Sequence, residues 1–503
     1  MNPDESNLPG VEFLDAAVGL AKSLQTGACD EIMTAAAVNY SSLGLLDDAI
    51  QSAEDISDSY LRDTAITQIA VNTVSHQPDA DLLSLVESID DPGNQNLALE
   101  EIAVKYGEQN LFDQALEICE RLDDRDAALA RIVPLIGKEN SLEWSEELIQ
   151  EINDSNTRVT CLIELATIAR SSDRLEEAGN FLTAAETEAE AEVESGLALY
   201  RILWLIAIAN VYEELSEREK AKDILLRASK LCDEIDPHGL TDLGTSWDRD
   251  EARVHLTGAF ARCLQFDQAE LTTQQIEHPI QFARASTQHA IEQHKDGRDT
   301  QALQMLSEAR DLIASETVYG DRMLTIRDEA CEQLALAYGT LKDFKTGLST
   351  ALLISNHAYQ FMTLIMLAQT AALAGLTDSV FDLQAALIHD YARAAYLISV
   401  SDALLKGGNK ELAVRLLFRA NEHADKLRPD QRCLLLIQIS FGLAAGDLQS
   451  KANELLSEVV NATVKLEDNH QQAQILVALA EQYRKHARQV STGEKQLLEE
   501  IPT

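Results

Sequence analysis

A spaced set of small and large residues recurs along nearly the whole chain of 503 residues. In the stretch 96–122, the small residue Ala103 is followed by Tyr106 three residues later, Ala115 twelve later and Leu122 nineteen later. Apolar residues at this spacing place two amphipathic helices back to back with a short turn between them. Because the pattern returns about thirteen times between Asp30 and the C-terminus, we predict an array of helical hairpins.

Three aligned columns define the repeat. The first holds a small residue or a close substitute, with Val133 as the outlier: Ala37, Ala70, Ala103, Ala166, Ala209, Thr257, Ala290, Ala335, Ala368, Ser401, Ser440 and Ala480. The second, twelve residues later, holds Ala49, Leu82, Ala115, Ser145, Ala178, Ala221, Ala269, Ala302, Gly347, Val380, Ala413 and Ala452. The third, seven further on, holds Ile56, Ile89, Leu122, Ile152, Ala185, Ala228, Ile276, Ala309, Ile354, Leu387, Ala420 and Val459.

Helix packing explains these columns. Paired helices approach to about 8–10 Å, and their closest crossing accepts only a small side chain. A larger group there would force the backbones apart, at a cost of about 1–3 kcal/mol. An aromatic residue such as Tyr40, Tyr106 or Tyr483, three places after the small one, fills the space beside the crossing.

The anchor spacing resembles that of the tetratricopeptide repeat, and the resemblance covers nearly the whole chain. It implies an all-α fold, a right-handed superhelical α-solenoid of about 13 antiparallel helix pairs. A related helical-hairpin solenoid is the alternative. The sequence departs from the family in its variable repeat length, and in a mostly missing aromatic residue near the start of the first helix, although Trp204 stands one residue from that place.

Changes in repeat length divide the chain. We expect a disordered N-terminus (1–9), an N-terminal capping helix (10–29) and short repeats (30–185). Extended repeats with long helices follow (186–328), including a loop at 236–247, then C-terminal repeats (329–491) and a terminal capping helix with a tail (492–503). No linker rich in Gly, Ser or Pro interrupts the array, so one continuous domain is predicted.

The charge is strongly negative, with 84 acidic and 41 basic residues and a net charge of −43. Such a field repels nucleic acid and anionic membranes, so neither is predicted as a partner. Two explanations of the acidity stay open: attraction of a basic partner, or a solvated surface suited to high salt. The even spread of the acids along the chain favours the second.

Targeting and redox signals point to the cytoplasm. The N-terminal segment 1–13 has neither a basic region nor an apolar run, so no signal peptide is visible. The most apolar runs, 197–212 and 361–376, fit buried repeat helices better than membrane spans. The seven cysteines are widely spaced and without a CxxC pair, which predicts reduced, buried thiols.

An arginine column stands eight residues before the small anchor. It comprises Arg62, Arg125, Arg158, Arg201, Arg249, Arg327, Arg393 and Arg432. One interpretation is a basic ladder that captures an acidic ligand. We favour a structural role, in which each guanidinium pairs with the acidic turn before its helix, because Asp residues stand near most of them.

Motifs for chemistry are missing from the sequence. There is no phosphate-binding glycine loop, no HExxH and no GxSxG, so we predict no catalysis, no cofactor and no metal. The Lys and Asn residues of a carboxylate clamp are also absent, apart from Asn210. A toroidal α/α enzyme is a low-ranking alternative, since hairpins of varying length and few tryptophans suit an open array better.

The predicted function is therefore that of a protein–protein interaction scaffold or adaptor. It would grip a helix or peptide of a partner, a basic one under the first explanation of the charge, in a concave groove. A regulatory or sensor module that binds a small ligand or its own terminus is the alternative. Candidate contact residues are Tyr200, Trp204, Trp247 and Tyr319, because they lie near irregular loops in the extended repeats.

Overall fold

The computed structural model describes residues 8–78, 80–139, 141–191, 198–235, 245–318 and 320–501. Within these ranges it contains 27 α-helices and no strand. The chain divides into two compact units: unit 1 comprises Met1–Ala128 with Gln384–Thr503, and unit 2 comprises Leu129–Leu383. The division falls inside α8 (Asp126–Lys138) and α21 (Thr377–Ala385).

Unit 1 contains helices from both ends of the chain. They are α1 (Val11–Ala21), α2 (Thr26–Ser42), α3 (Leu46–Glu54), α4 (Ser59–His76), α5 (Leu82–Glu87), α6 (Pro92–Glu108), α7 (Phe112–Cys119), α22 (Asp390–Lys406), α23 (Lys410–Ala424), α24 (Pro429–Ala445), α25 (Gln449–Val464), α26 (Asn469–Lys485) and α27 (Thr492–Leu498). Unit 2 contains α9 (Leu142–Ile149), α10 (Ser155–Ser171), α11 (Leu175–Ala191), α12 (Ala198–Glu214), α13 (Arg218–Glu234), α14 (Thr245–Arg262), α15 (Phe266–Gln274), α16 (Pro279–Lys295), α17 (Asp299–Ser315), α18 (Asp321–Thr340), α19 (Phe344–Ala351) and α20 (His357–Leu373).

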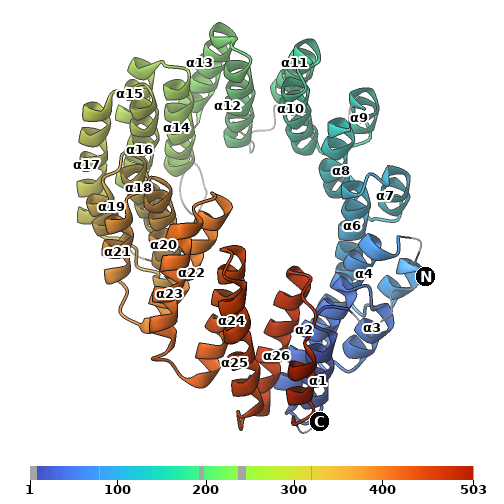
Figure 1. The fold of residues 1–503 in the computed structure, drawn as a ribbon. Coiled ribbons are helices and arrows are strands. Elements are labelled where there is room, and N and C mark those ends of the chain that lie inside the picture. The colour runs from blue at the N-terminus through green and yellow to red at the C-terminus, as the bar shows by residue number, and fades with distance from the viewer. Residues whose placement is uncertain are drawn as a thin grey trace. The chain divides into compact units, whose positions relative to one another are not determined.

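Hairpins of two helices are the building block of both units (Figure 1). A first helix such as α10 packs along the second helix that follows it, here α11, and against the first helix of the next hairpin, here α12. The same order holds for α16, α17 and α18. The structure therefore confirms the predicted all-α, tetratricopeptide-like helical repeat.

The anchor columns lie at the helix crossings, as the packing argument requires. All thirteen residues of the small-residue column, Val133 included, are buried. The aromatic residues that follow are buried too, and Tyr483 is completely enclosed. These crossings leave no room for longer side chains: a Cβ on Gly347 of the second column would come within 3.1 Å of the carbonyl oxygen of Ala335.

A column of buried aspartates, which sequence reasoning missed, lies seven residues before the small anchor. Each carboxylate accepts hydrogen bonds from the backbone N–H groups 27 and 28 residues later. Asp30 accepts from Ser57 and Asp58 at 2.9 and 3.1 Å, and Asp328 accepts from Ser355 and Asn356 at 2.9 Å each. Asp63 and Asp250 do the same.

These carboxylates set the start of the next hairpin. The second N–H donor of each pair belongs to the N-cap residue of the following first helix: Asp58 before α4, Asp91 before α6, His278 before α16 and Asn356 before α20. Backbone N–H groups at a helix start lack partners within the helix, and a buried charge needs hydrogen bonds. Each aspartate meets both requirements at once.

The expected segment boundaries meet the structure as follows. Region 10–29 contains all of α1 and the first turn of α2, so it is more than one capping helix. Residues 1–7 of the expected disordered segment and 236–244 of the expected loop lie outside the described residues. The helix α14 begins at Thr245 and takes the last part of that loop into its first turn. Region 492–503 begins with α27.

Candidate functional site

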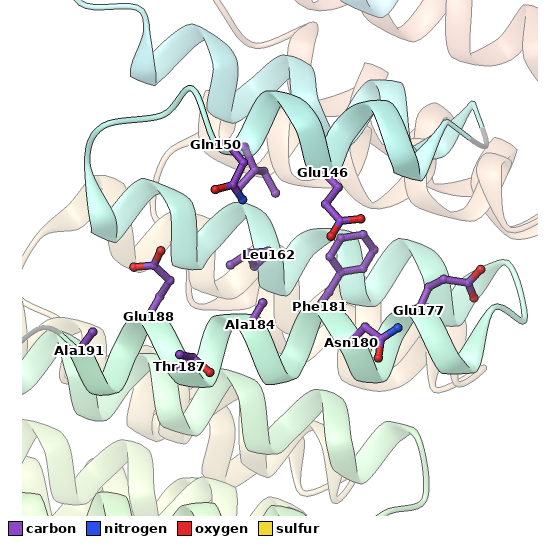
Figure 2. A pocket seen from close by; sticks show the side chains of 11 residues that line it. Glu146, Gln150, Leu162, Glu177, Asn180, Phe181, Ala184, Thr187, Glu188 and Ala191 are labelled. Atoms are coloured by element: carbon purple, nitrogen blue, oxygen red, sulfur yellow. The ribbon is translucent and has the colours of Figure 1, made fainter.

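A cleft of about 470 Å³ opens in unit 2 between α9, α10 and α11 (Figure 2). The two second helices that border it differ in length, since α9 has 8 residues and α11 has 17. Ala and Glu dominate α11, and Glu176 and Glu177 in its first turn suit the positive end of the helix dipole. Because α11 extends beyond its shorter neighbour, part of its surface has no second helix beside it.

Apolar side chains form the floor of this cleft. Ile149 comes from the end of α9, Leu162 from α10, and Phe181 and Ala184 from α11. The first three are at most 6% exposed, whereas Ala184 is open to solvent. Figure 2 shows Leu162 lying between the two second helices, with Glu146 from α9 directed toward the ring of Phe181.

Carboxylates and amides surround the apolar floor, and no Lys or Arg is among the described residues that line the cleft. Glu188 pairs with Arg158 at 3.2 Å, and Glu177 pairs with Arg174 at 3.0 Å. The backbone N–H of Glu177 and the Arg174 guanidinium hold the pKa of the Glu177 carboxyl below its usual value. Glu146 is exposed and forms no ion pair with another described residue, so the rim carries an uncompensated negative charge there.

This set of groups favours binding over chemistry. The lining offers no thiol, hydroxyl–imidazole pair or other nucleophile next to a base. An apolar floor flanked by negative charge instead suits an apolar side chain that has a Lys or Arg neighbour. Over the described ranges, no group of three or more His, Cys, Asp or Glu side chains is arranged to hold a metal ion.

Three of the four predicted aromatic contact residues, Tyr200, Trp204 and Trp247, lie among the described residues. Tyr200 and Trp204 both lie on α12, but Tyr200 is 56% exposed and Trp204 only 7%. Trp247 lies in the first turn of α14, where its ring meets the edge of His278 with 4.7 Å between centroids. Tyr319 lies outside the described residues. No ring contact joins Tyr200 or Trp204 to Trp247 in the part of the chain that the structure describes.

The cleft residues were missed by sequence reasoning, although a signal for them exists. The spacing of the second column rises from 33 residues between Ser145 and Ala178 to 43 between Ala178 and Ala221. A long repeat that follows a short one predicts that its second helix is longer than the second helix packed beside it. Aromatic content was the signal we followed instead, and it is higher in the buried face of α12 than in the cleft.

Arginines of the column pair with groups in two kinds of turn, the one that follows their own hairpin and the one that precedes their own helix. Arg62 pairs with Asp90 and Arg249 with Glu277, which both stand in the turn after the second helix of the same hairpin. Arg393 donates to the carbonyl oxygen of Leu387, in the turn before its own helix, at 2.8 Å. Among the other arginines of the column, Arg158 pairs with Glu188, Arg327 donates to Ser355, and Arg432 pairs with Asp425 and Glu458. Arg125 and Arg201 stand at the same register.

A second polar cluster lies on the first helices α14 and α16. Glu251 accepts hydrogen bonds from Gln281 and Arg284 at 2.5 Å each and lies 3.2 Å from His255. Burial raises the pKa of Glu251, but the hydrogen bonds from His255 and Arg284 outweigh burial and bring the pKa down to about 2. The charges of this cluster are matched internally, and none of its residues lines the cleft.

Two bulk expectations also meet the structure. All seven cysteines are free thiols, and six are buried. Burial raises the pKa of Cys119 to about 11, so this thiol is protonated at neutral pH. Searching the described helices finds none with both the length and the apolarity that a membrane crossing requires.

Comparisons with known proteins show no family. No family model and no curated protein matches the chain. Similar solved structures include the apo form of RapI (12% identity, TM-score 0.28, 77% of this chain and 98% of that one) and Ton1535 from Thermococcus onnurineus NA1 (13%, 0.25, 71% and 95%). Another is Naa15/Naa10 bound to HypK-THB (12%, 0.25, 97% and 92%). At these TM-scores no function follows from the likeness, and the chain is described by its own architecture, a tetratricopeptide-like array of helical hairpins.

Proposed function

We propose that this protein is a non-catalytic interaction scaffold that binds a basic, amphipathic segment of another protein. The observation that carries the proposal is the cleft between α9 and α11, which has an apolar floor, exposed at Ala184, and an acidic rim. A helix that offers one apolar face and flanking Lys or Arg side chains matches both properties. The net charge of −43 would speed the encounter with such a partner by long-range attraction.

An apolar stripe on α20 supports binding along the first helices as well. Met362, Met366 and Leu373 are exposed and lie on one face of this helix, because they are spaced by four and seven residues. Methionine side chains are flexible and polarisable, and they adapt to partners of different shape. We propose this stripe as a second place of contact for the same class of partner.

Designed peptides test the chemistry of the cleft. A helical peptide with one Leu/Ile face and flanking Lys residues is compared with a peptide of the same apolar face whose Lys residues are replaced by Glu. We expect the Lys peptide to bind, with an affinity that falls as salt rises, and the Glu peptide not to bind. Equal binding of the two peptides would contradict the proposal.

Variants place the binding within the molecule. Ala184→Trp fills the cleft and Glu146→Lys reverses the charge at its rim, so both should weaken binding of the Lys peptide by at least about tenfold. Gln304→Trp, an exposed position on the second helix α17, is the matched control and should leave the affinity unchanged. If Ala184→Trp binds as well as the wild-type chain and Met366→Glu does not, the α20 stripe is the site instead.

A further inference from the structure

The helix α26 stands at the position of a first helix in its hairpin. Within the described residues it is followed by α27, which has 7 residues and packs against α25. The position beside α26 is taken by α1, from the other end of the chain, and both helices belong to unit 1. The packing of α1 along α26 is as extensive as that within ordinary hairpins of the array.

The residues of α1 match those of a second helix. The segment Phe13–Ala17 aligns with Leu45–Ala49 at the start of α3, which places Ala17 in the second anchor column. Phe13, Leu14, Ala17 and Leu20 are completely buried. The α1 face is therefore built for a helix crossing rather than for solvent.

Close contacts at the crossing join α1 to the anchors of α26. The ring of Phe13 meets the edge of Tyr483 with 5.0 Å between centroids. Gly10, with a φ of +86°, lies so near the small anchor Ala480 that a Cβ on it would come within 2.9 Å of the Ala480 Cα. These are the same two α26 positions, small residue and aromatic, that meet the second helix in other hairpins.

Polar contacts extend the join beyond the apolar crossing. Ser23 accepts a hydrogen bond from the side-chain amide of Asn469 at 3.0 Å, across 446 residues of chain. Lys495 of α27 pairs with Glu12 of α1. Glu31 lies on α2, the helix after α1. It accepts a hydrogen bond from the side-chain amide of Gln474 at 3.0 Å and lies 3.3 Å from His470. Packing of α2 on both α1 and α26 continues the alternation of helices across the two chain ends.

We infer that α26 presents a docking face for a second-type helix, and that residues 8–24 of the same chain are its occupant. The last hairpin of the array is thus a composite of the two chain ends. An apolar helix face in a repeat array needs a helix packed on it, and here α1 covers that face of α26. This inference is independent of the proposed partner-binding cleft, which lies in unit 2.

A disulfide trap tests the docking in the full chain. Ser23→Cys with Asn469→Cys, in a Cys29→Ser background, should form a disulfide within one chain under mild oxidation, because the two side chains are in hydrogen-bond contact. The non-reduced product should run as a monomer of altered mobility and yield the linked peptides in mass spectrometry. Ser23→Cys with Asn409→Cys is the control and should not cross-link. A disulfide-linked dimer would show instead that α1 docks on a second copy, and failure to cross-link would overturn the inference.

A cleavable chain measures the strength of docking. A specific protease site inserted between Leu24 and Gln25 allows α1 to be cut free after folding. We expect the N-terminal fragment to stay bound through gel filtration, and a labelled peptide of residues 8–24 to exchange with it. Phe13→Ala in that peptide should weaken its binding by at least about a hundredfold, because the buried ring is lost. A fragment that separates at once, with no change in the unfolding midpoint of the remainder, would contradict the inference.

Discussion

The helices α26 in unit 1 and α10 in unit 2 are both the first helix of a hairpin. They differ in the second helices that pack beside them. Next to α26, the position is filled by α1, which buries Phe13 and Leu14 completely and leaves no space at the crossing. Next to α10, the short α9 and the long α11 leave an open cleft of about 470 Å³. The anchor residues are similar in both places. Helix length on either side of the crossing therefore decides whether apolar surface is enclosed in the core or borders an open cleft.

The largest expected difference between the two regions concerns their phenylalanines. Phe13→Ala leaves a closed cavity beside Tyr483 and should cost about 3–5 kcal/mol. Phe181→Ala only widens a cleft that is already open to solvent, and should cost roughly half as much. Hydrogen exchange read on α26 peptides for the first variant and on α10 peptides for the second measures the two losses. Equal losses would mean that the cleft is filled in solution.

Glycine substitutions sharpen the comparison at the crossing itself. Gly10→Ala adds a Cβ at 2.8 Å from the carbonyl oxygen of Ala480 and should cost about 2–4 kcal/mol, through overpacking together with a left-handed backbone. Gly408→Ala has nearly the same φ, +82°, and nothing within 4 Å of the added atom. It should cost only about 1 kcal/mol. If the two variants unfold at the same urea concentration, α1 does not pack on α26 as described.

Alanines on the second helices α1 and α11 should differ in their tolerance of added volume. Ala17→Leu overpacks the composite hairpin and should lower the free energy of unfolding by about 1–3 kcal/mol. Ala184→Leu enters the cleft and should change it by less than about 0.5 kcal/mol. Thermal melts of both variants are sufficient as a first measurement. A destabilising Ala184→Leu would mean that the space between α9 and α11 is smaller than the structure shows.

Acid should loosen α16 in unit 2 before it loosens the composite hairpin. Burial, with Arg298 nearby, lowers the pKa of His289 to about 4, whereas an unfolded histidine titrates near about 6.5. Between these values the unfolded state binds the extra proton, so the stability of this region falls as pH falls through that window, by on the order of 1 kcal/mol per pH unit.

Exchange measurements across pH give the test of that contrast. Protection of α16 amides should fall between pH 6.5 and 4, and by more than that of α26 amides. Burial lowers the pKa of His486 at the end of α26 as well, but His486 is exposed whereas His289 is enclosed. His289→Gln is the control, and it should reduce the dependence at α16, where burial also lowers the pKa of His278 at the N-cap. If α26 loses protection first, the composite hairpin is the weaker region.

The fold was predictable because its signal is periodic. Each small anchor, from Ala37 to Ala480, reports a steric requirement at its own crossing, and many such requirements align in one sequence. The pairing of α1 with α26 was not predictable in the same way, since Phe13–Ala17 shows only that the helix is of the second type. The sequence does not report which first helix α1 packs against. We expected α1 to act as a capping helix at the N-terminal end of the array.

The candidate site was less predictable than the fold. Tyr200, Trp204, Trp247 and Tyr319 were chosen for their aromatic rings near irregular segments, yet Trp204 is core and Trp247 packs on His278. The cleft depends on a difference between two helix lengths, which no single residue reports. Glu146 and Ala184 look like ordinary surface positions in the sequence, and only their neighbours in space give them a role.

The buried aspartates have a consequence for how such a chain can change in length. Asp30, Asp63, Asp250 and Asp328 occur where successive small anchors are 33 residues apart, and Val159, Ile202 and Ala283 stand at that place in the stretched repeats. An aspartate that binds N–H groups 27 and 28 residues away tolerates no single insertion in between. Removal of one whole period, by contrast, leaves every other such link intact. In those stretches the number of 33-residue repeats can change, whereas the length of each repeat is fixed by its aspartate.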